Sequence, residues 1–390
     1  MSIKDKIKNI TPEMIEWRHT IHERPEIAYQ EKNTSLFISN KLKEFDIEVH
    51  QGIGKTGIVG VIHGKENEGP QKSIGIRADI DALPMTEKTN LPYASKNEGS
   101  MHACGHDGHT TMLLGAAKYL SETRNFHGTV YCIFQPAEEG GNAGAKAMIN
   151  DGLFKKFEID TVWGIHNWPG IPVGHAVIHE GFAMAGGDYI VITVEGKGGH
   201  AAQPQFSNDP MVAAGLTITA LQSLISRQLD PFKSAVLSLT KIEGGSAFNV
   251  IPDTVTIGGT LRSTNEHLRS IMLKNIKKVV LSACEISNCK ATVEIRPGYP
   301  PTINDKKSAK LASKIFENTF GNSSINTKES PTMGSEDFSY LLEEKPGAYI
   351  WLGAGEKSEK LHSAHYDFND ELLPIGAEYW ANLAETILVK

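Results

Sequence analysis

The 390-residue chain has few cysteines, no long apolar run and no excess of positive charge. Four cysteines in so long a chain do not form a disulfide framework. The N-terminal residues lack the apolar segment of a secretory signal, and no run approaches the ~20 apolar residues that cross a membrane. These features predict a cytoplasmic protein with reduced thiols and no membrane partner.

The charge balance excludes a further class of partner. Lys and Arg number 39 against 46 Asp and Glu, which leaves a formal net charge of −7. A nucleic-acid-binding surface needs clustered Lys and Arg, so we expect no nucleic-acid partner. The length suits roughly two domains of ~150 residues each.

The first part of the chain has the pattern of an α/β fold. A Thr11-Pro12 pair predicts a helix that starts there and ends near His22, because Thr is a good N-cap and Pro suits the first helical position. A second helix is expected over 33–45. Continuous apolar runs then alternate with helical stretches, which is typical of a buried, mostly parallel sheet. The expected strands are 57–62, 73–79, 129–134 and 160–165.

The middle of the chain has a different order of elements. A half-buried strand is expected at 188–195, and it opens a βαββαβ sequence that ends with a strand at 291–296. This order is that of the ferredoxin-like unit. We therefore predict a catalytic domain built from 1–183 and 297–390, interrupted by an inserted domain at 184–296.

Polar side chains follow three of the expected strands. Asp79 and Asp81 follow the second strand, Glu138 and Glu139 the third, and His166 the fourth. In open α/β sheets the carboxyl ends of the strands are where ligands bind. Three such coincidences in succession predict one site built from separate loops.

The stretch 101–109 contains three histidines, a cysteine and an aspartate. Cys104 and His106 can converge on one ion, because thiolate and imidazole both suit Zn²⁺ and its neighbours. A polar loop with one buried cysteine is the simpler interpretation, but three histidines beside the cysteine favour a metal site. The candidate ligands are Cys104, His106, Glu139, His166 and His362. Five ligands suit two divalent ions, and their chemistry does not separate Zn, Mn, Co and Ni.

The adjacent pair Glu138-Glu139 predicts a division of roles. Neighbouring side chains point in different directions, so one can bind metal while the other acts as general base. The alternative is two exposed acids at a helix N-terminus, where negative charge is also favourable. The buried strand directly before the pair favours the site.

Eight motifs together resemble the M20 peptidase family, most closely its N-acyl-amino-acid amidohydrolases, such as hippurate hydrolases. They span nearly the whole chain: RADIDALP (77–84), HACGHDGHT (102–110), QPAEEGG (135–141), GIHNWPG (164–170), GKGGHAAQP (196–204), AFNVIPD (247–253), MGSEDFSY (333–340) and LHSAHYDF (361–368). The resemblance implies hydrolysis of the amide bond of an N-acyl amino acid by a metal-bound hydroxide, with Glu138 as base and then acid.

The resemblance also assigns further residues. His200 would reach into the site of the partner subunit, so that the inserted domain serves as lid and homodimerisation domain. Asn249 and Arg262 would bind substrate, and Asp81 would orient a metal-binding histidine. His102, His109 and His365 match motif positions without a ligand role.

Three other functions stay open at this point. A cysteine hydrolase could use Cys104 as nucleophile, but it would leave Glu139, His166 and His362 without a role. A dipeptidase or carboxypeptidase activity belongs to the same family. A non-enzymatic binding protein would have no need for a base such as Glu138.

Overall fold

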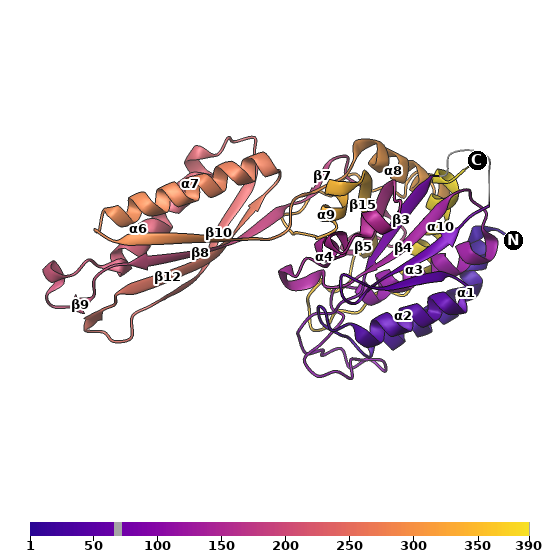
Figure 1. Cartoon of the computed structure of the whole chain (residues 1–390), viewed down its shortest axis with the longest axis horizontal. Coiled ribbons are helices and arrows are strands. Elements are labelled where there is room, and N and C mark those ends of the chain that lie inside the picture. The colour runs from indigo at the N-terminus through magenta and orange to yellow at the C-terminus, as the bar shows by residue number, and fades with distance from the viewer. Residues whose placement is uncertain (66–71, 390) are drawn as a thin grey trace. The chain divides into compact units, whose positions relative to one another are not determined.

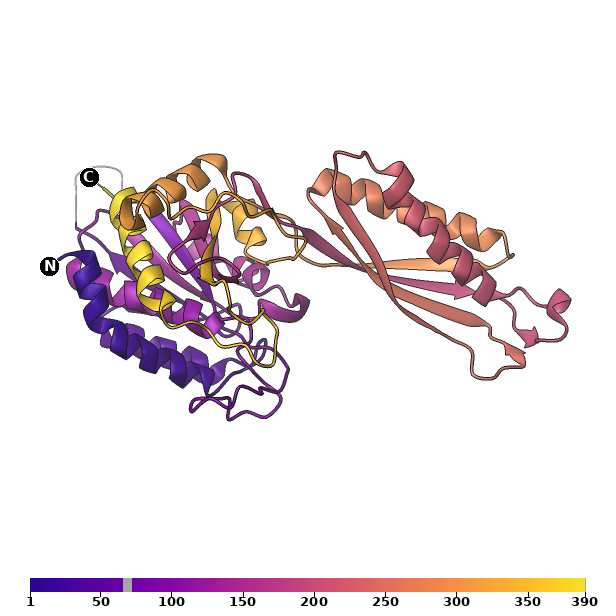
Figure 2. The same ribbon diagram turned by 180° about the vertical axis from the view of Figure 1, so that it is seen from behind.

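The computed structural model describes the chain apart from residues 66–71 and 390. The chain forms two compact units, drawn from two sides in Figures 1 and 2. The larger unit, called the catalytic unit below, comprises Met1–Ala183, Ile303–Pro331 and Asp337–Lys390. The smaller unit, called the insert, comprises Met184–Thr302 and Thr332–Glu336.

The catalytic unit is built on a seven-stranded sheet with the order β1-β2-β4-β3-β5-β15-β6. The four central strands, β4, β3, β5 and β15, are parallel, while β1, β2 and β6 pair antiparallel at the two sides. The strands are β1 (Glu48–Ile53), β2 (Gly57–His63), β3 (Ser73–Asp79), β4 (Thr129–Gln135), β5 (Thr161–Pro169), β6 (Ala176–Val177) and β15 (Gly347–Gly355). The predicted α/β class is confirmed, although β2 runs antiparallel to its neighbour β4.

Helices cover both faces of this sheet. Alternate residues of β15 point to opposite faces of the sheet. Ile350 and Leu352 join the core that contains α1, α3 and α10. On the other face, the Tyr349 ring contacts Phe338 at the start of α9. The helices of the unit are α1 (Ile3–His22), α2 (Lys32–Glu44), α3 (His106–Thr123), α4 (Gly144–Asn150), α5 (Leu153–Lys156), α8 (Lys306–Phe320), α9 (Ser339–Glu344) and α10 (Leu372–Ile387).

The predicted start of the first helix is wrong. The helix α1 begins at Ile3, and Ser2 and Asp5 form a reciprocal capping box there. Pro12 lies inside the helix, where it has no N–H to donate. The Thr11 hydroxyl donates to the Ile7 carbonyl at 3.0 Å, so Thr11 bonds within the helix and caps nothing. The second helix, by contrast, lies within one residue of its predicted bounds.

The insert has the predicted ferredoxin-like topology. Its four antiparallel strands have the order β10-β12-β8-β13, and the helices α6 and α7 pack on one face. Its elements are β8 (Gly186–Glu195), β9 (Gly199–His200), α6 (Pro210–Ser223), β10 (Ala235–Gly244), β11 (Val250–Ile251), β12 (Thr254–Ser263), α7 (Glu266–Glu285) and β13 (Lys290–Pro297). Ile190, Ile192 and Val194 of β8 face the helices and are buried, while Tyr189 on the opposite face is exposed.

All four cysteines are free and buried. Across the described residues, none of the helices has both the length and the apolar character that crossing a bilayer requires.

Candidate metal centre and active site

The candidate site lies at the carboxyl ends of the central strands. Asp79 ends β3, Glu138 and Glu139 follow β4, and His166 lies near the end of β5. Because β3 pairs parallel with both β4 and β5, these ends meet at one edge of the sheet.

The backbone between Cys104 and His106 places both side chains at the start of α3. Gly105 precedes the helix with φ of +92°, in the left-handed region. A Cβ atom there would lie 2.2 Å from Oδ1 of Asn167, so no other residue fits without a shift of its neighbours. Cys104 and His106 are both buried.

The five predicted ligands converge in overlapping groups. Cys104, His106 and His166 bring their donor atoms within 4.8 Å of one another, and so do Cys104, Glu139 and His362. The Cys104 Sγ atom lies 3.3 Å from Nε2 of His166. Cys104 belongs to both groups, so its sulfur lies near all four of the other predicted ligands.

Two buried ligand atoms that make no hydrogen bond support the prediction of a cation site. Nε2 of His106 is buried and makes no hydrogen bond, although it lies 3.6 Å from Oδ2 of Asp79. Oε1 of Glu139 also makes none, although it lies 3.3 Å from Nε2 of His362. Buried polar atoms without partners are costly, whereas the same lone pairs are what a metal ion needs. The residues present therefore fit a divalent metal.

Asp81 contacts two of the predicted ligands. His106 directs Nδ1 at the Asp81 carbonyl oxygen, 2.8 Å away, which leaves Nε2 for the ion. The Glu139 N–H donates to Oδ2 of Asp81 at 2.9 Å. Hydrogen bonds from such outer partners fix the tautomer and orientation of metal ligands.

Comparison with known proteins identifies the family of this chain. The model of Peptidase family M20/M25/M40 matches residues 75–386. The chain belongs to that family. It is 43% identical to a hippurate hydrolase of Campylobacter jejuni, over 98% of this chain and 99% of the relative. It is 38% identical to an N-acetylcysteine deacetylase of Bacillus subtilis, over 96% and 97% of the two chains.

A solved structure extends the comparison to the metal. The Bacillus subtilis YXEP protein, described as a dinuclear metal binding peptidase from the M20 family, matches with a TM-score of 0.85 and 35% identity. The match covers 98% of this chain and 99% of that one. The chain is therefore an M20 metal-dependent amidohydrolase with a divalent-metal site.

Two loops that carry predicted site residues contain strained backbone. Ala137, directly before Glu138, has φ of +54°, and His362 has φ of +63°. Non-glycine residues rarely adopt this left-handed region, and they keep it only where surrounding contacts enforce it. The His362 N–H donates to the Ala103 carbonyl at 2.8 Å, which is one such contact.

The carboxylates around His106 favour a positive charge there, whether that charge is a proton or a metal ion at Nε2. Burial alone would lower the pKa of His106, but the carboxylates of Asp79 and Asp81 raise it to about 10. Burial lowers the pKa of His166, and the neighbouring His109 adds to that effect. His109 lies 2.6 Å from Oδ1 of Asp79 and 2.6 Å from Oδ1 of Asn167, so both of its ring nitrogens have partners other than a metal.

A buried charge network, which sequence reasoning missed, joins the two ends of the catalytic unit. Arg18 of α1 donates to Asp367 and Asp370, each at 2.8 Å, and lies 3.7 Å from Asp107, the neighbour of His106. His22 lies 2.7 Å from the same Asp107. The network therefore fastens α1 to the start of α3 and to the loop that carries His362.

A second buried network, which sequence reasoning also missed, is formed by side chains of β3 and β4 together with Asp337. Arg77 donates to Asp79 at 2.7 Å and to Asp337 at 3.0 Å, and its Nε donates to Gln135 at 2.7 Å. The Ala145 N–H donates to the Asp337 carboxylate at 2.9 Å. Asp337 lies in the MGSEDFSY motif. Its carboxylate is paired with Arg77 within the catalytic unit.

The predicted residues of the insert fall at two separate places. His200 is exposed in β9, which pairs with Val250 of β11, and the Ala201 N–H donates to the Asn249 carbonyl at 3.0 Å. Arg262 lies at the other end of β12, opposite Gly187, and donates to the Ser335 hydroxyl. His200 and Asn249 are thus neighbours, whereas Arg262 is distant from both within the insert.

The remaining motif histidines differ in environment. His102 is buried, neither ring nitrogen forms a hydrogen bond, and burial lowers its pKa to about 3. His365 is exposed. Neither belongs to any of the ligand groups found among the described residues.

Proposed function

We propose that this M20 chain hydrolyses the amide bond of N-acyl amino acids, with hippurate-like compounds as substrates. The observation that carries the proposal is the convergence of Cys104, His106, Glu139, His166 and His362 beside a second, buried glutamate, Glu138. The relatives named hippurate hydrolase and N-acetylcysteine deacetylase support the N-acyl amino acid as the substrate class.

These ligands would hold two divalent ions, Zn, Mn, Co or Ni. When bound, the ions would polarise the substrate carbonyl and lower the pKa of a water molecule. Glu138 is the general base in this proposal, and its carboxylate lies within 4.8 Å of donor atoms of His106 and Glu139. Its carboxylate removes a proton from the attacking water and returns that proton to the amine nitrogen as the C–N bond breaks.

A hydrolysis panel tests the function. The compounds are N-benzoyl-, N-acetyl- and indolyl-acyl amino acids and unmodified dipeptides, measured before and after chelation. We expect N-acyl amino acids to be cleaved fastest, activity to be lost on chelation, and metal to restore it. Activity that survives complete metal removal would support instead a cysteine hydrolase, which the short distance between Cys104 and His166 also permits.

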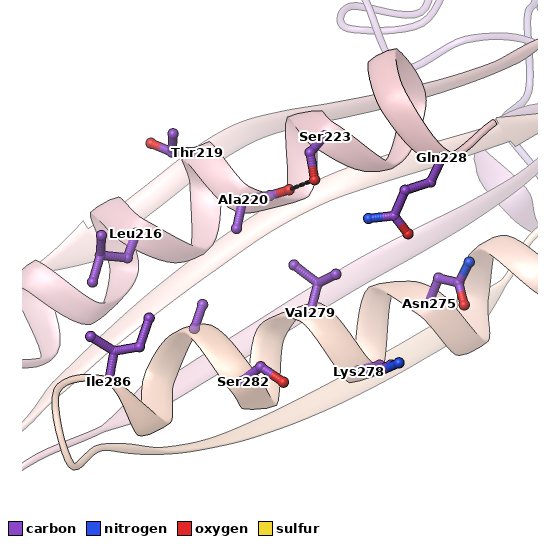
Figure 3. A pocket seen from close by; sticks show the side chains of 11 residues that line it. Leu216, Thr219, Ala220, Ser223, Gln228, Asn275, Lys278, Val279, Ser282 and Ile286 are labelled. Carbon is purple, nitrogen blue, oxygen red and sulfur yellow. Dashed lines mark hydrogen bonds between the residues drawn. The ribbon is translucent and has the colours of Figure 1, made fainter.

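We further propose a homodimer formed through the insert. Exposed apolar side chains of α6, namely Met211, Val212 and Leu216, support this proposal, because such side chains normally mark an interface when they cluster. A groove of about 470 Å³ runs between α6 and α7, lined by Leu216, Val279 and Ile286 among others (Figure 3). The edge strand β10 adds unpaired backbone groups, and a two-fold axis would use the same patch on both chains.

In such a dimer, His200 of the partner subunit would stabilise the oxyanion, and Asn249 and Arg262 would bind the substrate carboxylate and amide. The adjacency of His200 and Asn249 supports a shared role. Mixing two inactive variants, His200→Ala and Glu138→Ala, tests the proposal. A mixed dimer would have one intact site, so activity should return towards about a quarter of wild type. No recovery in confirmed mixed dimers would contradict action in trans.

A further inference from the structure

Trp168 lies two residues beyond the ligand His166 in β5. Strand alternation places both side chains on the same face of the sheet. The two rings meet edge to face with centroids 5.8 Å apart. Trp168 is therefore an aromatic side chain directly beside the ligand groups, and neither metal binding nor proton transfer uses it.

A second tryptophan holds this indole in place. The rings of Trp168 and Trp351 are stacked, with centroids 3.9 Å apart and planes 6° apart. Trp351 lies in the neighbouring strand β15, opposite His166 in the register, and His179 contacts its ring edge to face at 4.9 Å. Trp351 is only 1% exposed, so it provides a rigid backing for Trp168.

The two indoles differ in exposure. Trp351 is fully buried, but Trp168 is only half-buried and so retains accessible surface at the end of the strand. Trp163, on the same strand, has a packing role alone. It is 1% exposed and donates its indole N–H to Thr161. Core packing does not require a half-exposed indole beside a cluster of polar ligands.

We propose that Trp168 contacts the acyl group of the substrate and favours aromatic acyl groups. The inference rests on the proposed amidohydrolase function, because attack on the acyl carbon requires that carbon to lie at the ligand cluster that includes His166. The acyl substituent then lies within reach of the neighbouring indole. An immobilised indole loses little freedom on binding, and aromatic rings pair favourably in offset or edge-to-face arrangements.

A matched pair of substrates isolates the acyl group. N-benzoylglycine and N-acetylglycine share the amine and the carboxylate and differ only in the acyl substituent. In Trp168→Leu we expect kcat/KM for N-benzoylglycine to fall about tenfold or more, while the value for N-acetylglycine changes less than about threefold. Trp168→Phe keeps an aromatic ring and should retain most of the selectivity. Trp163→Phe, which alters an indole on the opposite face of the same strand, should leave the ratio unchanged.

The outcomes separate the two proposals. Equal losses for both substrates in Trp168→Leu, or no loss for either, would overturn the role of Trp168 and leave the amidohydrolase function intact. A wild-type protein that hydrolyses neither compound would contradict the proposed function. Benzoate binding, followed by isothermal titration calorimetry, tests the aromatic contact without turnover. Binding to wild type that is lost in Trp168→Leu supports the contact, and equal binding to both refutes it.

Discussion

The catalytic unit and the insert differ in two ways: in how many charged side chains they bury and in how many large apolar side chains they expose. Among the described residues, the insert buries only two acidic or basic side chains, Asp188 and Glu336, and the catalytic unit buries all the others. Conversely, thirteen of the eighteen exposed large hydrophobic side chains in the described residues lie in the insert, although it is the smaller unit.

The difference follows from what each unit must hold. Buried charges destabilise a fold unless they are paired, so a unit that contains many of them needs dense networks such as that of Arg18 and Asp107. Exposed apolar side chains do not destabilise the fold, but they favour association with another surface. The catalytic unit thus carries a preorganised polar site, and the insert carries a surface suited to a partner.

The largest expected effect tests the polar site of the catalytic unit. Glu138→Gln removes the proton acceptor and should lower kcat by about 10²–10⁴-fold while metal content stays unchanged. Glu139→Gln, the neighbouring control, should instead lower metal content. Elemental analysis beside steady-state kinetics measures both quantities. The reverse pattern would exchange the roles of the two glutamates.

A smaller effect, on stability, is expected at the buried network. Arg18→Met leaves carboxylates without their guanidinium and should lower the free energy of unfolding by about 3 kcal/mol. Lys118→Met removes the more exposed ion pair with Glu13 and should cost less than about 1 kcal/mol. Urea unfolding of the metal-free variants measures the two. If both cost the same, the Arg18 network would not be a special feature of the catalytic unit.

The apolar surface of the insert predicts a change in assembly. Leu216→Glu places a charge on α6 and should weaken a dimer by about 10- to 100-fold without unfolding the insert. Leu36→Glu alters an exposed side chain of similar character on α2 of the catalytic unit and should leave assembly unchanged. Analytical ultracentrifugation over a range of concentrations compares them. An unchanged dimer in Leu216→Glu would place the interface elsewhere.

The smallest expected effect is a pH dependence confined to the catalytic unit. Burial would lower the pKa of His22, but its hydrogen bond to Asp107 raises it from the ordinary 6.5 to about 9. The protonated form is therefore favoured by folding. Its stabilisation is fully present below pH 6.5 and is lost as the pH rises through about 9. Denaturant unfolding of the metal-free protein between pH 6 and 10 should show this decline, and His22→Gln should remove it.

The α/β sheet, the ferredoxin-like insert and the loops whose predicted ligands lie close together could be located from the sequence. Those features depend on local patterns: apolar runs, and polar residues directly after them. The start of α1 was mispredicted because Thr11-Pro12 gives a strong local signal, whereas Ser2 and Asp5 form the actual capping box. Propensity at one position is overridden when a longer helix can be capped earlier.

The networks could not be predicted in this way. Arg18 is paired with Asp367 and Asp370, which follow it by almost the whole chain, and no local pattern marks such a pair. The stacking of Trp168 on Trp351 likewise depends on the parallel register of β5 and β15, which the sequence does not reveal. Similarly, Asn249 and Arg262 appear close in sequence, yet β12 separates them.

The membership of Thr332–Glu336 in the insert bears on how the molecule can be recombined. The Ala185 N–H donates to the Thr332 carbonyl at 3.1 Å, and Arg262 donates to Ser335. A chimera that exchanges only 184–302 with a homologue would leave Thr332–Glu336 unexchanged. The hydrogen bonds that this segment forms with the insert would then join residues from two different proteins. The insert is therefore inherited as two pieces of sequence, and a crossover that preserves it must include both.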